Sequence, residues 1–131
     1  MKVIKIPVNE KPTVEEVDYE EFNGSPESTA NKFIDGWGEI VSTVFVEAGI
    51  VLLVNEDGRL KQLPINNIAS AIYGFNAEHP NMLVVGNAWA IHLKLLEDGD
   101  VDFDDGDWPA EKFLERLIEN GKQQGALPQE W

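Results

Sequence analysis

The chain has 131 residues, of which 43% are hydrophobic, which suits one compact domain with a single core. It contains no cysteine, so disulfides and thiolate metal sites are excluded, and its net charge of -14 argues against direct binding to nucleic acid or to an anionic membrane. Lys5 and Pro7 interrupt the first apolar run, which is too short for a signal peptide or a membrane span, so we expect a soluble cytoplasmic protein.

The N-terminal part combines a strand with a first acidic block. Residues 2–8 alternate between apolar and other side chains, which predicts a strand. Residues 10–27 are strongly acidic, and Val14 and Val17 give only a weak second strand. The carboxylates of this block that we expect to face a partner are Glu15, Glu16, Asp18, Glu20 and Glu21.

A short helix is expected next. Ser25, Pro26 and Glu27 have the chemistry of a helix start, because they supply a cap, a preset φ and a negative charge near the positive end of the dipole. The apolar residues that follow at helical spacing are Ala30, Phe33, Ile34 and Trp37. Gly36 is expected to end this helix in the left-handed conformation.

Residues 39–66 predict a three-stranded meander. Residues 39–47 and 50–54 are rich in Val, Ile and Phe, and the short gap between them favours a tight hairpin. Residues 55–58 read Asn-Glu-Asp-Gly, which is typical of a second turn, and residues 59–63 are expected to return as the third strand before Pro64.

The second half adds two helices and a long strand. Asn66 or Asn67 can cap a short helix, and residues 82–96 predict the longest strand, with a bulge at Gly86. Residues 97–107 form a second acidic block, which we expect to be a loop. Residues 109–121 have a clean apolar stripe and predict an amphipathic helix that ends at Gly121.

These elements predict an α+β fold. We expect one domain over residues 1–131, with its core at roughly 30–96 and an antiparallel sheet built on the meander. About three short helices are expected to pack on one face of that sheet.

Three pieces of the chain, in order, carry a family resemblance: residues 33–40, 53–66 and 82–87. With the Asn-Glu-x-Gly turn followed by Pro-x-Asn in the middle piece, they resemble a family of small phage, plasmid and conjugative-element proteins with a domain of unknown function. The resemblance covers roughly residues 30–92. Two positions depart from it, because Trp37 separates Gly36 from Gly38 and Asn67 stands where an arginine often follows.

The resemblance implies a mobile-element origin and a small accessory protein, and it brings no catalytic residue. The residues themselves show no nucleophile beside His79 or His92 and no phosphate-binding loop, so we expect no enzyme activity and no cofactor.

The second acidic block permits two interpretations. Its aspartates and Glu111 occupy several positions of a calcium-binding loop, but the glycine is displaced to Gly106, so no metal ligand is assigned and an irregular calcium site stays an alternative. If residues 98–104 are extended, alternate carboxylates lie about 6.6 Å apart. Their charge density then approaches that of the DNA backbone.

We therefore expect a non-enzymatic protein that binds a basic protein surface, most concretely an acidic DNA mimic that inhibits a host nucleic-acid-binding or defence protein. The partner-binding residues expected in the second block are Asp98, Asp100, Asp102, Asp104, Asp105 and Asp107. The alternatives are a small-ligand or calcium-binding accessory domain at residues 55–61 or 100–111, and a structural or dimerisation module anchored by exposed Trp108 and Trp131.

Overall fold

The computed structural model describes residues 1–22, 28–104, 106 and 108–131. The elements in chain order are β1 (Lys2–Ile6), β2 (Thr13–Glu16), α1 (Tyr19–Phe22), α2 (Thr29–Ile34), β3 (Gly38–Ser42), the 3-10 helix η1 (Val46–Ala48), β4 (Ile50–Asn55), α3 (Asn67–Tyr73), β5 (Ala88–Leu95), β6 (Val101–Phe103) and α4 (Ala110–Gln123). The helix start expected at Ser25, Pro26 and Glu27 lies outside the described residues.

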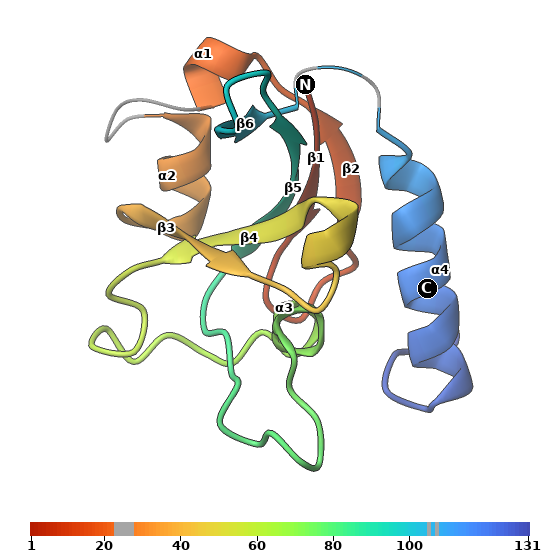
Figure 1. Ribbon diagram of the computed structural model, residues 1–131. Helices are drawn as coiled ribbons and strands as arrows, with labels where there is room; N and C mark the ends of the chain where they lie inside the picture. The colour runs from red at the N-terminus through yellow and green to blue at the C-terminus, as the bar shows by residue number, and fades with distance from the viewer. Residues whose placement is uncertain (23–27, 105, 107) are drawn as a thin grey trace.

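The strands form one sheet with the order β2-β1-β5-β4-β3 (Figure 1). β6 pairs with the C-terminal half of β5, opposite Leu93 to Leu95. All pairings among the described strands are antiparallel. Together with the helices, this sheet confirms the predicted α+β class.

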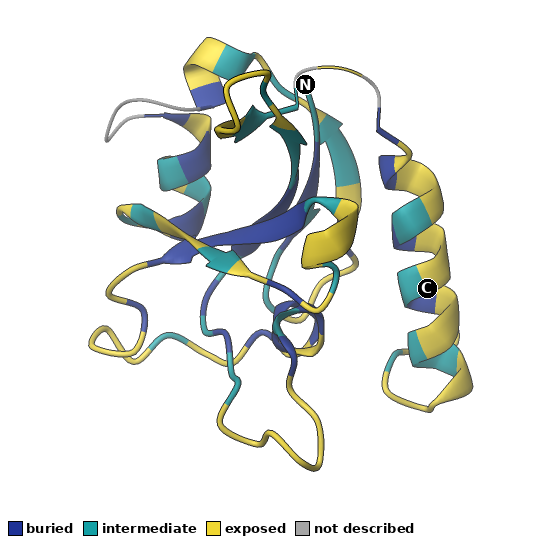
Figure 2. Ribbon diagram, viewed as in Figure 1, coloured by how far each residue is buried: buried dark blue, intermediate teal, exposed yellow. Residues whose placement is uncertain are grey.

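Helices cover both faces of the sheet. Because successive side chains of a strand point to opposite faces, Leu52 enters a core cluster with α3 and α4, whereas Leu53 enters a second cluster with α1 and α2. All six residues of β4 are buried (Figure 2). The expectation that the helices share one face is therefore wrong, since a strand that is apolar on both sides needs a cover on each.

The predicted meander has only two of its three strands. β3 and β4 pair as expected, with Ile40 opposite Leu53. Residues 59–63 form successive turns instead of a strand, with Gln62 at a positive φ of 56° and Leu60 86% exposed. No apolar face holds this segment against the sheet, and β5 takes the place beside β4 instead.

The connection between β3 and β4 is longer than the predicted tight hairpin. β3 ends at Ser42 because the Thr43 hydroxyl donates to the Ile50 carbonyl at 2.6 Å and accepts from the Phe45 amide at 3.0 Å. These side-chain bonds replace the next rung of the ladder, and the chain continues through η1 to Gly49.

Other predicted boundaries also shift. β5 begins at Ala88 instead of residue 82, because Gly86 turns the chain at φ 79°. α2 ends with Asp35, not Gly36, in the left-handed conformation. α4 continues past Gly121 to Gln123. A Cβ on Gly121 would collide with the Leu127 side chain, so this glycine lets the tail fold back onto the helix.

Trp108 fixes the start of α4 against the sheet. Its side chain is 4% exposed, and its indole Nε1 donates to the Lys2 carbonyl at 2.8 Å. The Lys2 ammonium donates to Glu111 at 2.9 Å, and this hydrogen bond lowers the pKa of the Glu111 carboxyl below its ordinary value. Trp131 is partly buried against the same core cluster. Neither tryptophan is the exposed anchor that a dimerisation module was expected to use.

Three asparagine amides join segments that have no regular ladder. Asn55 donates to the carbonyls of Ile34 and Asp35, at 2.9 and 3.1 Å. Asn87 accepts from the Val8 amide and donates to the Phe33 carbonyl, both at 3.0 Å.

Asn66 is the most buried of the three, at 1% exposure. Its Nδ2 donates to Ile6 and Gly86, at 2.9 and 3.0 Å, and its Oδ1 accepts from the Ala69 amide at 3.0 Å. The predicted cap of the short helix is therefore Asn66, and Asn67 is the first helical residue.

Within the described residues, no helix has both the length and the apolar character needed to cross a lipid bilayer.

Replacing Asn66 with Ala is expected to lower the free energy of unfolding by about 2–4 kcal/mol, because the cap is lost and two buried carbonyls lose their donor. Urea unfolding measures the change. The matched control is Asn67→Ala at the exposed neighbouring position, expected to change stability by no more than about 0.5 kcal/mol. Equal losses in the two variants would contradict the role given to the Asn66 amide.

Candidate functional site

The two acidic blocks meet at one end of the molecule. α1, from the first block, lies beside β6, from the second (Figure 1). The Tyr19 hydroxyl donates to Asp102 at 2.9 Å, and the rings of Tyr19 and Phe22 contact Phe103 edge to face, with centroids 6.1 and 6.2 Å apart. An aromatic cluster thus holds together two segments that are about 80 residues apart in the sequence.

The predicted partner-binding residues divide into three groups. Those with exposed side chains are Glu16, Asp18, Glu20, Glu21, Asp98 and Asp100. Glu15, Asp102 and Asp104 are partly buried. Asp105 and Asp107 lie outside the described residues. We define the acidic end as the exposed carboxylates on α1, directly before it and on the turn before β6, namely Asp18, Glu20, Glu21, Asp98 and Asp100.

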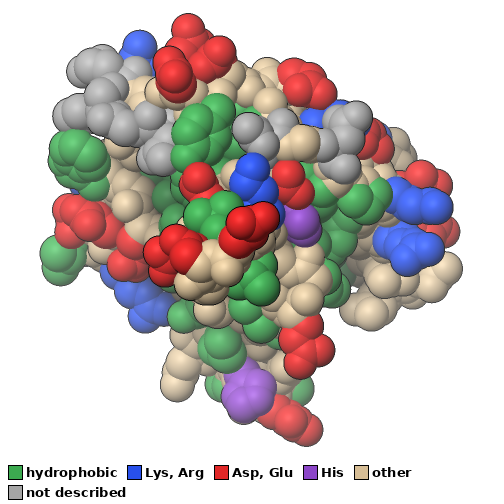
Figure 3. All heavy atoms as spheres, turned by 45° about the horizontal axis from the view of Figure 1, so that its top comes forward, with side chains coloured by type: hydrophobic (Ala, Val, Ile, Leu, Met, Phe, Trp, Pro, Cys, Tyr) green, Lys and Arg blue, Asp and Glu red, His purple; other side chains and the backbone are tan. Residues whose placement is uncertain are grey.

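The regular stripe expected over residues 98–104 is wrong in its geometry. Only Val101–Phe103 is a strand, and Asp98 lies in the preceding turn, where it accepts from the Asp100 amide at 3.0 Å. Asp102 is bonded to Tyr19, and Asp104 to His92. On the face shown in Figure 3, acidic side chains form separate groups among apolar and basic ones.

The His92–Asp104 pair is the contact that sequence reasoning missed. His92 Nδ1 lies 2.8 Å from Asp104 Oδ2, and Nε2 lies 3.1 Å from the Ala48 carbonyl oxygen. The imidazole also stacks on the Trp108 indole, with centroids 5.3 Å apart. Both ring nitrogens therefore lie within hydrogen-bond distance of an oxygen atom.

This arrangement is structural in character. A general base needs a free ring nitrogen within reach of a substrate proton, and Nε2 of His92 is occupied by a main-chain carbonyl. The pair joins β5, η1 and the chain after β6. The main chain joins the same two residues, because the Asp104 amide donates to the His92 carbonyl at 2.8 Å. This contact depends on the strand register, which no local sequence pattern reveals.

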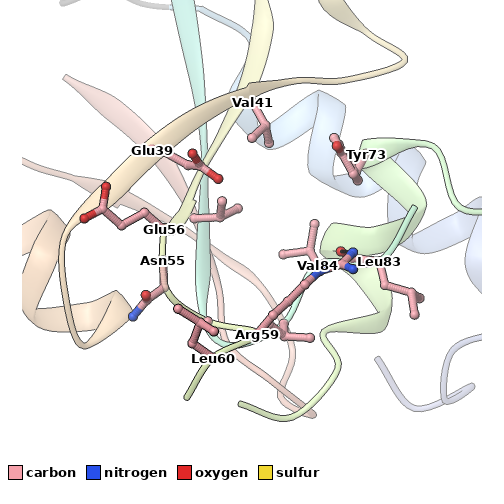
Figure 4. Close-up of a pocket in the computed structure, with 12 residues that line it drawn as sticks. Glu39, Val41, Asn55, Glu56, Arg59, Leu60, Tyr73, Leu83 and Val84 are labelled. Carbon is pink, nitrogen blue, oxygen red and sulfur yellow. Dashed lines mark hydrogen bonds between the residues drawn. The ribbon is translucent and has the colours of Figure 1, made fainter. Parts of the chain in front are cut away.

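A second candidate site is a cavity of about 170 Å³ below β3, which we call the motif pocket (Figure 4). Its polar lining residues are Glu39, Asn55, Glu56, Arg59 and Tyr73. Glu39 comes from β3, Glu56 directly follows β4, and Tyr73 lies across the pocket on α3 (Figure 4). All three pieces that carry the family resemblance contribute to this lining.

Arg59 closes the floor of the motif pocket. Its guanidinium donates to the carbonyls of Leu83 and Asn81, at 3.2 and 3.4 Å, and so ties the turn after β4 to the segment before β5. Because the Arg59 guanidinium is bonded to these carbonyls, the carboxylates of Glu39 and Glu56 favour a cationic group in the pocket. Pockets for drug-sized ligands usually exceed about 300 Å³, so this one suits a group the size of a single side chain.

Close steric contacts explain why glycine occupies positions 36 and 38 beside the pocket. A Cβ on Gly36 would lie 2.8 Å from Asn55 Nδ2, and one on Gly38 would lie 2.7 Å from Leu53 Cδ1. Both contacts are too close for a side chain at either position. The Gly-x-Gly segment therefore lets the chain after α2 approach the Asn55 amide and the sheet.

No group of three or more His, Asp or Glu side chains in the described part of the chain is arranged to hold a metal ion. In particular, Asp100, Asp102, Asp104 and Glu111 do not converge on one point there.

The fold and the two sites thus define a class: a small α+β protein with an acidic end and a pocket the size of one side chain. The family described as a domain of unknown function (DUF3846) matches residues 1–116, and the chain belongs to this family. The match extends well beyond the predicted span of about 30–92 and includes both acidic blocks. Comparison with curated proteins found no match. Comparison with solved structures found none either.

Removing the Asp104 carboxylate is expected to loosen the β5–β6 pairing. Asp104→Ala should speed hydrogen exchange at the amides of residues 102 and 104, which point toward β5, and lower stability by about 0.5–1.5 kcal/mol, because one hydrogen-bonded partner of His92 is lost. Exchange measured by mass spectrometry or NMR gives the readout. Asp100→Ala, at an exposed carboxylate of the same hairpin, serves as control. Equal acceleration in both variants would argue against a role of the His92–Asp104 pair in holding β6 to β5.

Proposed function

We propose that this protein is a non-enzymatic interaction protein whose acidic end binds a basic surface on a partner protein. The observation that carries the proposal is the meeting of the two acidic blocks through Tyr19 and Asp102. This contact gathers exposed carboxylates of α1 and of the turn before β6 on one end of a folded scaffold. A preformed charged surface of this kind steers association with an oppositely charged partner.

The overall charge supports the same proposal. A net charge of -14 on 131 residues costs stability through self-repulsion. At the acidic end, Asp18 accepts from the Glu20 amide and Asp98 from the Asp100 amide, both main-chain groups of their own turns. A complementary basic surface would offset the repulsion on binding.

In its most concrete form, the partner is a protein that uses the same basic surface to hold nucleic acid, so that this chain acts as a DNA mimic. The resemblance to mobile-element proteins adds a biological setting, in which the partner is a host nucleic-acid-binding or defence protein in the cytoplasm. Mimicry here would rely on the local density of carboxylates at the acidic end, not on a regular phosphate-like spacing.

The test compares two variants of equal net charge. One neutralises the acidic end with Asp18→Asn, Glu20→Gln, Glu21→Gln, Asp98→Asn and Asp100→Asn. The other neutralises five exposed carboxylates elsewhere, with Glu47→Gln, Glu78→Gln, Glu115→Gln, Glu119→Gln and Glu130→Gln. Each is used, beside the unaltered chain, to capture proteins from host lysate at low salt, followed by elution with duplex DNA.

The unaltered chain and the control variant should retain a DNA-binding protein that duplex DNA displaces, and the acidic-end variant should lose it. Raising the salt from about 0.1 M to 1 M shortens the screening length from about 10 Å to 3 Å and should release the partner. Capture that both variants share, or that duplex DNA does not displace, would refute the proposal.

The motif pocket favours a second candidate, a small-ligand accessory domain. Its size and its two carboxylates select a small organic cation as the ligand. Titration with butylamine or methylguanidine should shift the NMR signals of Glu39, Glu56 and Gly58, and Glu39→Gln should weaken this response more than Glu47→Gln does. Absence of any shift at millimolar concentration, where such small ligands bind, would remove this candidate.

A further inference from the structure

The two edges of the sheet differ in how well they are protected. β2, at one edge, has four residues, carries Glu15 and Glu16, follows Pro12 and packs against α4. These are the usual devices that prevent an edge from pairing with another chain. β3, at the other edge, has β4 on one side and no further strand among the described residues.

The hydrogen-bond pattern identifies which groups of β3 point outward. Gly38 lies opposite Asn55, and the flanking Glu56 amide donates to the Trp37 carbonyl at 3.0 Å. Gly38 and Asn55 are therefore a pair without mutual hydrogen bonds, and the pattern alternates along an antiparallel ladder. The N–H and C=O groups of Gly38, Ile40 and Ser42 consequently face away from β4.

The free edge also has a recess on each face of the sheet. Glu39 and Val41 line the motif pocket on the α3 face. On the opposite face, a cavity of about 180 Å³ is lined by apolar side chains that include Phe22, Ile40 and Leu53. Beside it, Trp37 is 54% exposed and Ile40 is 48% exposed.

We propose that β3 binds an extended segment of a partner protein as an additional strand. The outward groups of Gly38, Ile40 and Ser42 supply main-chain hydrogen bonds, and the two recesses take alternate side chains. A basic side chain fits beside Glu39, where it approaches Glu39 and Glu56 of the motif pocket. The next side chain, on the other face, is apolar and packs against Ile40 and Trp37.

Charge selects a basic partner segment over a second copy of this chain. Pairing β3 with β3 would bring together two molecules that each carry -14, with a Glu39 on each strand. A segment with a lysine or arginine at its central position instead forms a charge pair with Glu39. The apolar recess shares Phe22 and Phe103 with the aromatic cluster of the acidic end, but none of the exposed carboxylates of that end lines either recess. Either proposal can therefore fail without the other.

The test uses random short peptides displayed on phage and selected on the immobilised full chain. The enriched peptides should carry a lysine or arginine flanked by Val, Ile or Thr, and synthetic copies should protect the Ile40 and Ser42 amides from hydrogen exchange. Enrichment of peptides without this pattern, or protection elsewhere only, would overturn the proposal. A concentration-dependent dimer of the free chain that Ile40→Lys abolishes would also overturn it, since β3 would then bind a copy.

Matched variants separate the backbone contribution from the side chain. Ile40→Pro removes an outward N–H that β4 does not use, and Ile40→Thr removes the same apolar side chain but keeps the N–H. Peptide binding should fall about ten-fold or more in Ile40→Pro relative to Ile40→Thr. Glu39→Gln should weaken basic peptides by about two- to five-fold and leave a neutral analogue unchanged.

N-methylation of the peptide gives a measurement that does not depend on how well the proline variant folds. Methyl groups on alternate amides, those facing β3, should abolish binding, and methyl groups on the intervening amides should leave it intact. Equal effects at both sets of positions would overturn the added-strand geometry.

Discussion

The buried amide of Asn66 is the interaction on which much of the structure depends. It holds the end of β1, the turn at Gly86 and the first turn of α3 at the same point. Ile6 is the last residue of the β1 ladder, whereas the Gly86 carbonyl and the Ala69 amide lie outside the strands. Without a side-chain partner, these two groups would be buried unpaired at a cost of about 1–3 kcal/mol each. Asn55 and Asn87 do the same for the end of α2 and the start of β5.

These asparagines also explain why the motif pocket exists. The segments before and after it, residues 53–66 and 82–87, are mostly irregular, and irregular backbone keeps a fixed shape only when its hydrogen bonds are satisfied. Arg59 bonds the Leu83 carbonyl in the lining of the pocket, and Asn66 bonds the Gly86 carbonyl just beyond it in the sequence. The residues that carry the family resemblance thus build the shape of the pocket, and Glu39 and Glu56 supply its charge.

The acidic residues serve two different purposes. Asp102 and Asp104 are partly buried and bind Tyr19 and His92, so they hold β6 to α1 and to β5. The carboxylates of α1 and of the turn before β6 remain in solvent. The same sequence block therefore contains residues that build the end of the molecule and residues available to a partner. The β3 edge offers outward main-chain groups together with the Glu39 carboxylate.

The sequence alone determined the features that depend on local chemistry. Apolar periodicity predicted β1, β5 and α4, β-branched composition predicted β4, and the cap preference of asparagine predicted a helix start at Asn66 or Asn67. Tertiary structure decided the rest, because it depends on pairing between distant segments. Residues 59–63 follow a predicted turn as a third strand would, but they contain no β-branched or aromatic residue, and β5 pairs with β4 instead. The two acidic blocks meet because Tyr19 and Phe22 reach Phe103, and His92 meets Asp104 through strand register, neither of which leaves a local pattern in the sequence.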